Sequence, residues 1–329
     1  MEMHRRTFLG AMGAAAVAAA LPRGLEAGAP PAPDAMAKVK FWPAVCTPCD
    51  KNLKFDPAIY ADMMAYFKEQ GADGIVVLGT TGEFPSFSVV ERKQVAEVAL
   101  KHAHGMDMMI QTGTPNFPET LELSKHAADH GASSLLMIPP FYYNNPPTEG
   151  LTRYYSMVFD EVKIPINLYH IPRTSGVSIS LDLLHSLSHY PNLAGIKDSN
   201  GLPQEYEDFA NTFPNLNMRT GTLNNLERAL DHNMGAILME GNNFTRLIAD
   251  VFAARRAGRD YHPALAKVRE AIGIMRPGGI YDYGPMKYAL SLQMGTPQFY
   301  QRPPFLDVTD AQKAAIREGL AKMKDMTTA

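Results

Sequence analysis

The chain has 329 residues, of which 46% are hydrophobic and 20% charged, and its formal net charge at pH 7 is −3 with a pI of about 6.4. This composition is typical of a globular protein with enough apolar residues for a large core. The slightly acidic balance, without a basic stripe interleaved with aromatic residues, argues against nucleic acid or an anionic membrane as a partner.

The N-terminal segment differs in composition from the rest of the chain. The pair Arg5-Arg6 is followed by an alanine-rich apolar stretch over residues 11–21. A basic start, a short apolar region and small residues after it are typical of an export signal, and the paired arginines resemble a twin-arginine signal. The stretch is too short for a membrane-spanning helix, which needs about 20 apolar residues. We therefore expect residues 1–37 to be a signal and linker and the mature protein to be periplasmic or secreted. A misassigned start, and hence a cytoplasmic protein, is the alternative.

From residue 39 onward, short apolar runs alternate with amphipathic helical patterns. The eight predicted strands cover residues 39–45, 74–78, 108–112, 134–138, 166–169, 193–197, 217–220 and 236–239. The helices that follow them are predicted over residues 57–70, 89–104, 118–130, 149–161, 181–189, 203–213, 223–233 and 244–257. Strands that are each followed by a helix predict an α/β fold of the (β/α)8 TIM barrel type. A doubly wound open sheet is the alternative because local patterns do not show closure, although no Gly-x-Gly-x-x-Gly motif opens a helix.

The last part of the chain has a different pattern. Three helices are predicted over residues 263–274, 284–292 and 310–324, and Thr309 is a suitable N-cap for the last one. We therefore predict a barrel over residues 38–261 and a small C-terminal helical domain over residues 262–329.

Cys46 and Cys49 are the two cysteines of the sequence, and their spacing is that of a redox motif or of half a zinc site. No second pair completes a zinc site, and the residues that follow indicate a loop rather than the helix of a redox motif. A local disulfide after export is one outcome. We favour the other, two thiols near the end of a strand, and we expect no metal site.

Two residues at neighbouring strand ends carry the main chemical prediction. Lys197 ends the sixth predicted strand, at the end of the barrel where a TIM barrel has its active site. A lysine amine in a partly dry site can attack a carbonyl and form a Schiff base. Tyr169 ends the fifth strand, so its phenol would lie near this amine as a general acid and base.

A polar loop follows the second predicted strand. Gly79 and Gly82 flank Thr80 and Thr81 in this loop. The glycines permit a tight turn with exposed backbone N–H groups, which suits a carboxylate, and the threonines add hydroxyl groups. A plain glycine-rich turn is the alternative interpretation.

Residues from about 39 to 325 resemble the dihydrodipicolinate synthase and N-acetylneuraminate lyase family of Schiff-base aldolases. The matching motifs are Gly79-Thr80-Thr81-Gly82-Glu83, Tyr143-Asn144-x-Pro146, Tyr169-x-Ile171-Pro172 with Gly176, Gly195-Ile196-Lys197, Gly284-Pro285-Met286-Lys287 and Arg302-Pro303-Pro304. They occur in the family's order and spacing over nearly the whole mature chain.

The resemblance implies roles for these residues. Lys197 would form an imine with the ketone of a 2-oxo acid, typically pyruvate, and Tyr169 would move protons to and from it. Thr80 and Thr81, beside Gly79, would bind the carboxylate and link the proton relay, with Thr80 as a catalytic residue. Tyr143 would complete the proton relay from a neighbouring subunit, which implies a homo-oligomer, a dimer or tetramer. The imine on Lys197 takes the place of a metal or a separate cofactor.

The chain also departs from the family's patterns. Synthases carry an arginine where this chain has Thr174, and Arg173 precedes it, so the role of Arg173 as an anchor for the second substrate is in doubt. The acidic pair that sialic acid lyases carry after the seventh strand is missing. A polar segment around Glu240 and Gly241 follows the eighth strand and is a candidate contact for the variable part of the substrate. A solvated loop charge is the alternative interpretation of Glu240.

We therefore predict an exported lyase, an aldolase or dehydratase, that acts on pyruvate or on a 2-oxo acid resembling a sugar acid. Export argues against lysine biosynthesis because the unstable aldehyde of that pathway is made in the cytoplasm. A dihydrodipicolinate synthase-type condensation of pyruvate with an aldehyde is one alternative. A 2-oxo acid binding protein without catalysis is another, but such a protein has no need for the pair of Tyr169 and Lys197.

Overall fold

The structure is a computed structural model that describes residues 36–328, with side chains described to residue 324. The expected export signal and linker therefore lie outside the described residues, apart from residues 36 and 37. Within the described part, no helix combines the length and the apolar character that a membrane span requires.

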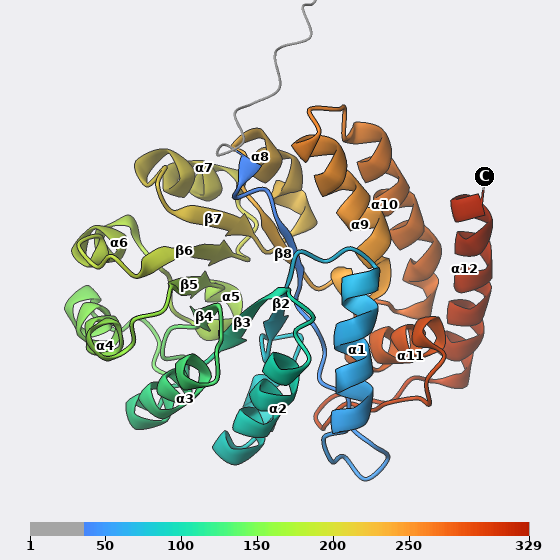
Figure 1. The fold of residues 1–329 in the computed structure, drawn as a ribbon, viewed down its shortest axis with the longest axis horizontal. Coiled ribbons are helices and arrows are strands. Elements are labelled where there is room, and N and C mark those ends of the chain that lie inside the picture. The colour runs from blue at the N-terminus through green and yellow to red at the C-terminus, as the bar shows by residue number, and fades with distance from the viewer. Residues whose placement is uncertain (1–35, 329) are drawn as a thin grey trace, which may run out of the picture. The chain divides into compact units, whose positions relative to one another are not determined.

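Eight parallel strands form the central sheet (Figure 1). They are β1 (Phe41–Pro43), β2 (Gly74–Val77), β3 (Asp107–Gln111), β4 (Ser134–Met137), β5 (Ile166–His170), β6 (Leu193–Asp198), β7 (Asn217–Thr220) and β8 (Ala236–Leu238). Their order is β1-β8-β7-β6-β5-β4-β3-β2. Hydrogen bonds from Val45 N to Val76 O (3.1 Å) and from Asp73 N to Phe41 O (3.0 Å) join β1 to β2 and close the sheet. The predicted TIM barrel is confirmed, and each strand ends within two residues of its predicted bounds.

Helices follow the strands and surround the sheet (Figure 1). They are α1 (Pro57–Glu69), α2 (Val89–Lys101), α3 (Phe117–Asp129), α4 (Thr148–Glu161), α6 (Leu181–Leu187), α7 (Pro203–Thr212), α8 (Leu226–Asp231) and α9 (Gly241–Arg256). Side chains at the N-termini fix several starts. Asp56 accepts hydrogen bonds from Ala58 N and Ile59 N at the start of α1, and Ser88 forms a capping box with Glu91 at the start of α2.

Three helical segments differ from the prediction. The short helix α5 (Pro172–Ser175) begins with Pro172 and is ended by Gly176, which has a left-handed backbone (φ 69°). It was not predicted because four residues are too few to show a helical period. The predicted helix over residues 223–233 is split into the 3-10 turn η3 (Leu223–Asn225) and α8. The helix α9 begins at Gly241, before the apolar period starts, and non-helical angles at Phe244 (φ −127°, ψ 26°) bend it there.

The C-terminal region contains α10 (His262–Met275), the 3-10 turn η4 (Arg276–Gly278), α11 (Tyr283–Met294) and α12 (Asp310–Thr328). These helices share a buried apolar cluster with β1, β8 and α9. In it the rings of Phe41 on β1 and Phe252 on α9 stack with centroids 5.7 Å apart. The helices thus pack on one side of the barrel, while the division into two domains stays a prediction.

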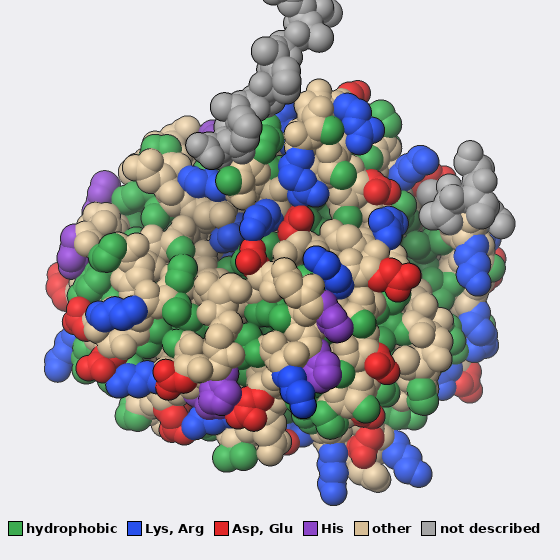
Figure 2. All heavy atoms as spheres, in the orientation of Figure 1, with side chains coloured by type: hydrophobic (Ala, Val, Ile, Leu, Met, Phe, Trp, Pro, Cys, Tyr) green, Lys and Arg blue, Asp and Glu red, His purple; other side chains and the backbone are tan. Residues whose placement is uncertain are grey.

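The two cysteines are buried free thiols, as we favoured from the sequence. Burial raises the pKa of the Cys46 thiol to about 12 and also raises the pKa of Cys49. Both groups therefore remain protonated at neutral pH and unreactive. On the outer surface, acidic and basic side chains are interspersed over the face shown in Figure 2.

Candidate active site

Lys197 and Tyr169 lie side by side at the carboxyl ends of β6 and β5. The two residues are in register on the adjacent strands, so their side chains point the same way. Lys197 Nζ lies 3.3 Å from the phenol oxygen of Tyr169 and 4.4 Å from its ring centroid. Both side chains are buried, with 4% and 2% exposure respectively. The predicted amine and phenol therefore meet in a site that is largely shielded from water.

The environment of Tyr169 lowers the pKa of its phenol. Burial alone raises the pKa of this phenol, but the Lys197 ammonium and hydrogen bonds from Thr80, Ser199 and Lys197 outweigh burial. The net pKa of Tyr169 lies below its usual value. Such a phenol can take up and return a proton more readily than an ordinary tyrosine.

The loop after β2 reaches the same point. Thr80 Oγ1 lies 3.2 Å from the Tyr169 phenol oxygen, so one chain of hydrogen bonds joins Lys197, Tyr169 and Thr80. Two turn bonds shape the loop, from Gly82 N to Gly79 O (3.0 Å) and from Glu83 N to Thr80 O (2.9 Å). A Cβ atom at Gly82 would lie 2.9 Å from Leu78 Cα, so glycine is required there. Thr81 is buried beside it.

Three other predicted residues lie apart from this chain of hydrogen bonds. Tyr143 is 61% exposed on the loop after β4, where its ring meets that of Tyr142 with centroids 5.4 Å apart. Arg173 is exposed on α5. Gly241 is buried at the start of α9, where a Cβ atom would lie 2.9 Å from both Phe41 Cζ and Pro43 Cβ. The roles of Tyr143, Arg173 and Gly241 in binding and catalysis stay predictions.

Glu240 follows β8 at the same end of the barrel. Burial raises the pKa of the Glu240 carboxyl group, and the charge of Lys197 partly offsets this shift. Tyr281, from the segment before α11, is close enough for the charge of Glu240 to contribute to the raised pKa of its phenol. Glu240 therefore lies within electrostatic reach of the Lys197 amine.

The next residues of β5 and β6, His170 and Asp198, point away from the barrel interior. Together with Glu205 they place potential metal-binding atoms within 4.8 Å of one another. His170 Nδ1 accepts a hydrogen bond from Ile179 N (3.0 Å), so the neutral ring carries its proton on Nε2, 3.1 Å from Glu205 Oε1. A metal ion on Nε2 would force that proton onto Nδ1, against the Ile179 N–H group. A metal ion on His170 Nε2 would therefore cost the hydrogen bond from Ile179 N.

A second group of this kind, Glu97, His126 and His130, lies on α2 and at the end of α3. His126 Nε2 is 2.8 Å from Glu97 Oε1, and Glu97 and His130 are exposed. This group belongs to the outer helical layer, so it adds nothing to the chemistry at the strand ends.

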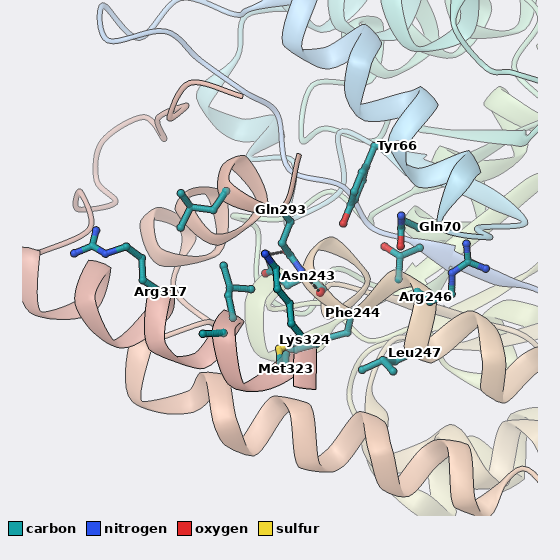
Figure 3. Close-up of a pocket in the computed structure, with 14 residues that line it drawn as sticks. Tyr66, Gln70, Asn243, Phe244, Arg246, Leu247, Gln293, Arg317, Met323 and Lys324 are labelled. Atoms are coloured by element: carbon teal, nitrogen blue, oxygen red, sulfur yellow. Dashed lines mark hydrogen bonds between the residues drawn. The ribbon is translucent and has the colours of Figure 1, made fainter. Parts of the chain in front are cut away.

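A cavity lies elsewhere in the described part of the chain. A space of about 640 Å³ opens between α1, α9, α11 and α12, with Tyr66, Arg246, Gln293 and Arg317 among its lining residues (Figure 3). Lys197, Tyr169 and Thr80 are not part of this lining. The strand ends, rather than this cavity, thus locate the candidate site.

Sequence reasoning missed several residues that surround the site. Ser199 hydrogen-bonds Tyr169, and its place two residues after Lys197 was the available indication. Tyr283 on α11 donates a hydrogen bond to the Thr80 carbonyl oxygen (3.0 Å), and Lys287 forms a buried ion pair with Glu83. No local pattern indicated these two contacts, because about 200 residues separate the partners along the chain.

Residues 38–323 match the model of the dihydrodipicolinate synthetase family. The chain belongs to this family. It is 32% identical to a 4-hydroxy-tetrahydrodipicolinate synthase of Agrobacterium fabrum over 84% of this chain and 96% of that protein. It is 30% identical to an uncharacterized DapA-like lyase of Chloroflexus aurantiacus over 80% of this chain and 90% of that protein.

Solved structures show the same relationship. A prophage protein of the dihydrodipicolinic acid synthase family from E. coli K12, in complex with pyruvate, is 26% identical and has a TM-score of 0.78 over 87% of this chain and 98% of that one. A sialic acid aldolase from Ruminococcus gnavus, at 22% identity, shares the fold with a TM-score of 0.81 over 88% of this chain and 99% of that one. The members of the family are lyases, and we assign the chain to this enzyme class.

Proposed function

We propose that the protein is a Schiff-base lyase that acts on pyruvate or on a larger 2-oxo acid through Lys197. The observation that carries this proposal is the chain of contacts from Lys197 Nζ to the Tyr169 phenol (3.3 Å) and on to Thr80 Oγ1 (3.2 Å). The relative that was solved with pyruvate supports the class of substrate.

The geometry suits imine formation. In its neutral form the Lys197 amine attacks the ketone carbon and gives one proton to the former carbonyl oxygen by way of Tyr169. Tyr169 supplies the second proton, so the oxygen leaves as water and a protonated imine remains. The resulting protonated imine accepts the electron pair of an adjacent C–C or C–H bond, so the bond can break without a metal ion. Thr80 lies where it can exchange a proton with Tyr169, and the N–H groups and hydroxyls of Thr80 and Thr81 suit the substrate carboxylate.

We further propose that Tyr143 acts in an oligomer. Tyr142 and Tyr143 are 83% and 61% exposed, and two adjoining aromatic rings on one loop suit a protein interface. In a dimer or tetramer, Tyr143 of one subunit would extend the relay of its neighbour.

The variable part of the substrate is proposed to resemble a sugar acid. Glu240 follows β8 within electrostatic reach of Lys197, and a carboxyl group can form hydrogen bonds with substrate hydroxyls. The twin-arginine-like start supports export of the folded enzyme. Condensation of pyruvate with an aldehyde is the second candidate, since several curated relatives at 29–32% identity are 4-hydroxy-tetrahydrodipicolinate synthases.

Borohydride trapping tests the proposal. The protein is incubated with pyruvate and borohydride, and its intact mass is compared with that of Lys197→Ala. An adduct of reduced pyruvate on the wild type alone is expected, followed by cleavage of 2-oxo sugar acids in a screen. Reversible binding of pyruvate to a folded protein without any adduct would favour the non-catalytic binding protein instead. Fractionation of cells that express the full-length chain tests export.

A further inference from the structure

The loop that presents Thr80 is anchored from outside the barrel strands. Glu83, the last residue of this loop, has a left-handed backbone (φ 55°, ψ 33°) and a side chain with no exposure. Lys287 of α11 forms an ion pair with Glu83 Oε1 and is equally buried. The other donors of the Lys287 ammonium bind Thr47 O (2.7 Å) and Tyr300 O (2.8 Å). All three N–H groups of this ammonium therefore have an acceptor.

A second anchor lies one turn earlier on the same helix. The Tyr283 hydroxyl donates to the Thr80 carbonyl oxygen (3.0 Å), and its ring stacks on Phe305 with centroids 3.9 Å apart. Burial, reinforced by the negative charges of Glu83 and Tyr169, raises the pKa of Tyr283 to about 12. The hydroxyl group thus keeps its proton, and remains a donor, at every pH at which the protein is expected to work.

The spacing explains how one helix holds both ends of the loop. Tyr283 and Lys287 are four residues apart on α11, so their side chains lie on one helix face. The residues that they contact, Thr80 and Glu83, are three apart on a turn. A third contact from the C-terminal region, Arg302 N to Glu83 Oε2 (3.0 Å), fixes the other carboxylate oxygen.

We propose that Tyr283 and Lys287 are positioning residues that fix the loop 79–83 for catalysis. This inference rests on the proposed function, because the loop matters for imine chemistry only if Thr80 and Thr81 bind and relay there. The contact from Thr80 Oγ1 to the Tyr169 phenol is 3.2 Å long, so a displacement of the loop by about 1 Å would break it. The C-terminal helix α11 is then part of the catalytic apparatus although it does not touch the substrate.

Tyr283→Phe is the first test, because it removes one hydroxyl group and keeps the ring on Phe305. The matched control is Tyr288→Phe on the same helix, where the hydroxyl group contacts Arg317 (2.8 Å) and not the loop. We expect Tyr283→Phe to raise the pyruvate concentration for half-maximal adduct formation by roughly two- to tenfold, as the loss of one hydrogen bond permits. The control should not change it. Equal behaviour of the two variants would overturn the proposal.

Removing the ion pair requires a double variant, since either single change leaves a buried charge without its partner. Glu83→Gln with Lys287→Met removes both charges and is expected to fold. At low pyruvate concentration its rate of adduct formation should be lower than that of the wild type, and at saturating pyruvate the two rates should be equal. This result would show that pyruvate binding is weakened while the reactivity of Lys197 is unchanged. A folded double variant with the wild-type pyruvate dependence would contradict the inference.

Amide hydrogen exchange measures how firmly the loop 79–83 is held, and it does not depend on catalysis. Amides of residues 79–83 should exchange faster in Tyr283→Phe than in the wild type or in Tyr288→Phe. If the wild type forms no adduct, the proposed function fails and the exchange data decide whether α11 fixes the loop. Unchanged exchange in Tyr283→Phe would refute the anchoring itself.

Discussion

Lys287→Met leaves the Glu83 carboxylate buried without its partner. Methionine keeps most of the length and volume of the lysine stem but removes the ammonium and its three contacts, to Glu83, Thr47 O and Tyr300 O. Breaking a buried ion pair from one side costs about 3–5 kcal/mol. Two backbone carbonyl groups also lose a donor, so the upper part of this range applies. For a chain of this size the loss corresponds to a decrease in Tm of about 5–15 °C.

Thermal unfolding followed by circular dichroism measures this loss. The control is Lys322→Met, because Lys322 pairs with Glu318 on the surface of α12, where both side chains are more than 60% exposed. An exposed pair contributes less than about 1 kcal/mol, so the control should lower Tm by no more than a few degrees. The double variant of Glu83→Gln with Lys287→Met should recover the part of the stability that Lys287→Met loses to the unpaired Glu83 charge, but not the part lost at the carbonyl groups of Thr47 and Tyr300. A Tm of Lys287→Met equal to that of the control would refute the assignment of a buried, charged pair.

Three further predictions concern other groups. Tyr169→Phe should slow adduct formation by about 10²- to 10⁴-fold without unfolding the protein. The rate is measured by stopping the borohydride trapping reaction at timed intervals. A rate equal to that of the wild type would show that Tyr169 does not take part in the proton relay. Arg302 lowers the pKa of Glu91 to about 2, so the stability from this pair is complete above the ordinary glutamate pKa and is lost as pH falls towards 2. The difference in Tm between wild type and Glu91→Gln should therefore shrink over that acidic range, and a constant difference would contradict the pKa. Finally, Cys46 and Cys49 should resist alkylation at pH 8 until the protein is unfolded; rapid labelling of the native protein would contradict their burial.

The sequence was sufficient for the order of strands and helices and for the centre of the candidate site. Strands and helices leave periodic patterns of two and 3.6 residues in the chain, so both can be located locally. Once the strands are placed, the rule that barrel sites lie at carboxyl strand ends puts Lys197, Tyr169 and Thr80 at one place. The structure agrees, with contacts of 3.3 Å and 3.2 Å among them. The short helix α5 and the 3-10 turn η3 before α8 were not predicted, because each contains too few residues to show a helical period.

Only the tertiary structure decided what holds this centre in place. The contacts of Tyr283 with Thr80 and of Lys287 with Glu83 join residues about 200 positions apart, and nothing in the local sequence around either partner indicates the other. Closure of the sheet between β1 and β2 likewise depends on how distant strands pack. The sequence by itself determined which residues end the strands, because backbone and side-chain preferences act over a few neighbours. Long-range packing decides which of those residues are buried, which form ion pairs and which are fixed by contacts from other elements. It does so because it brings together groups that lie far apart along the chain.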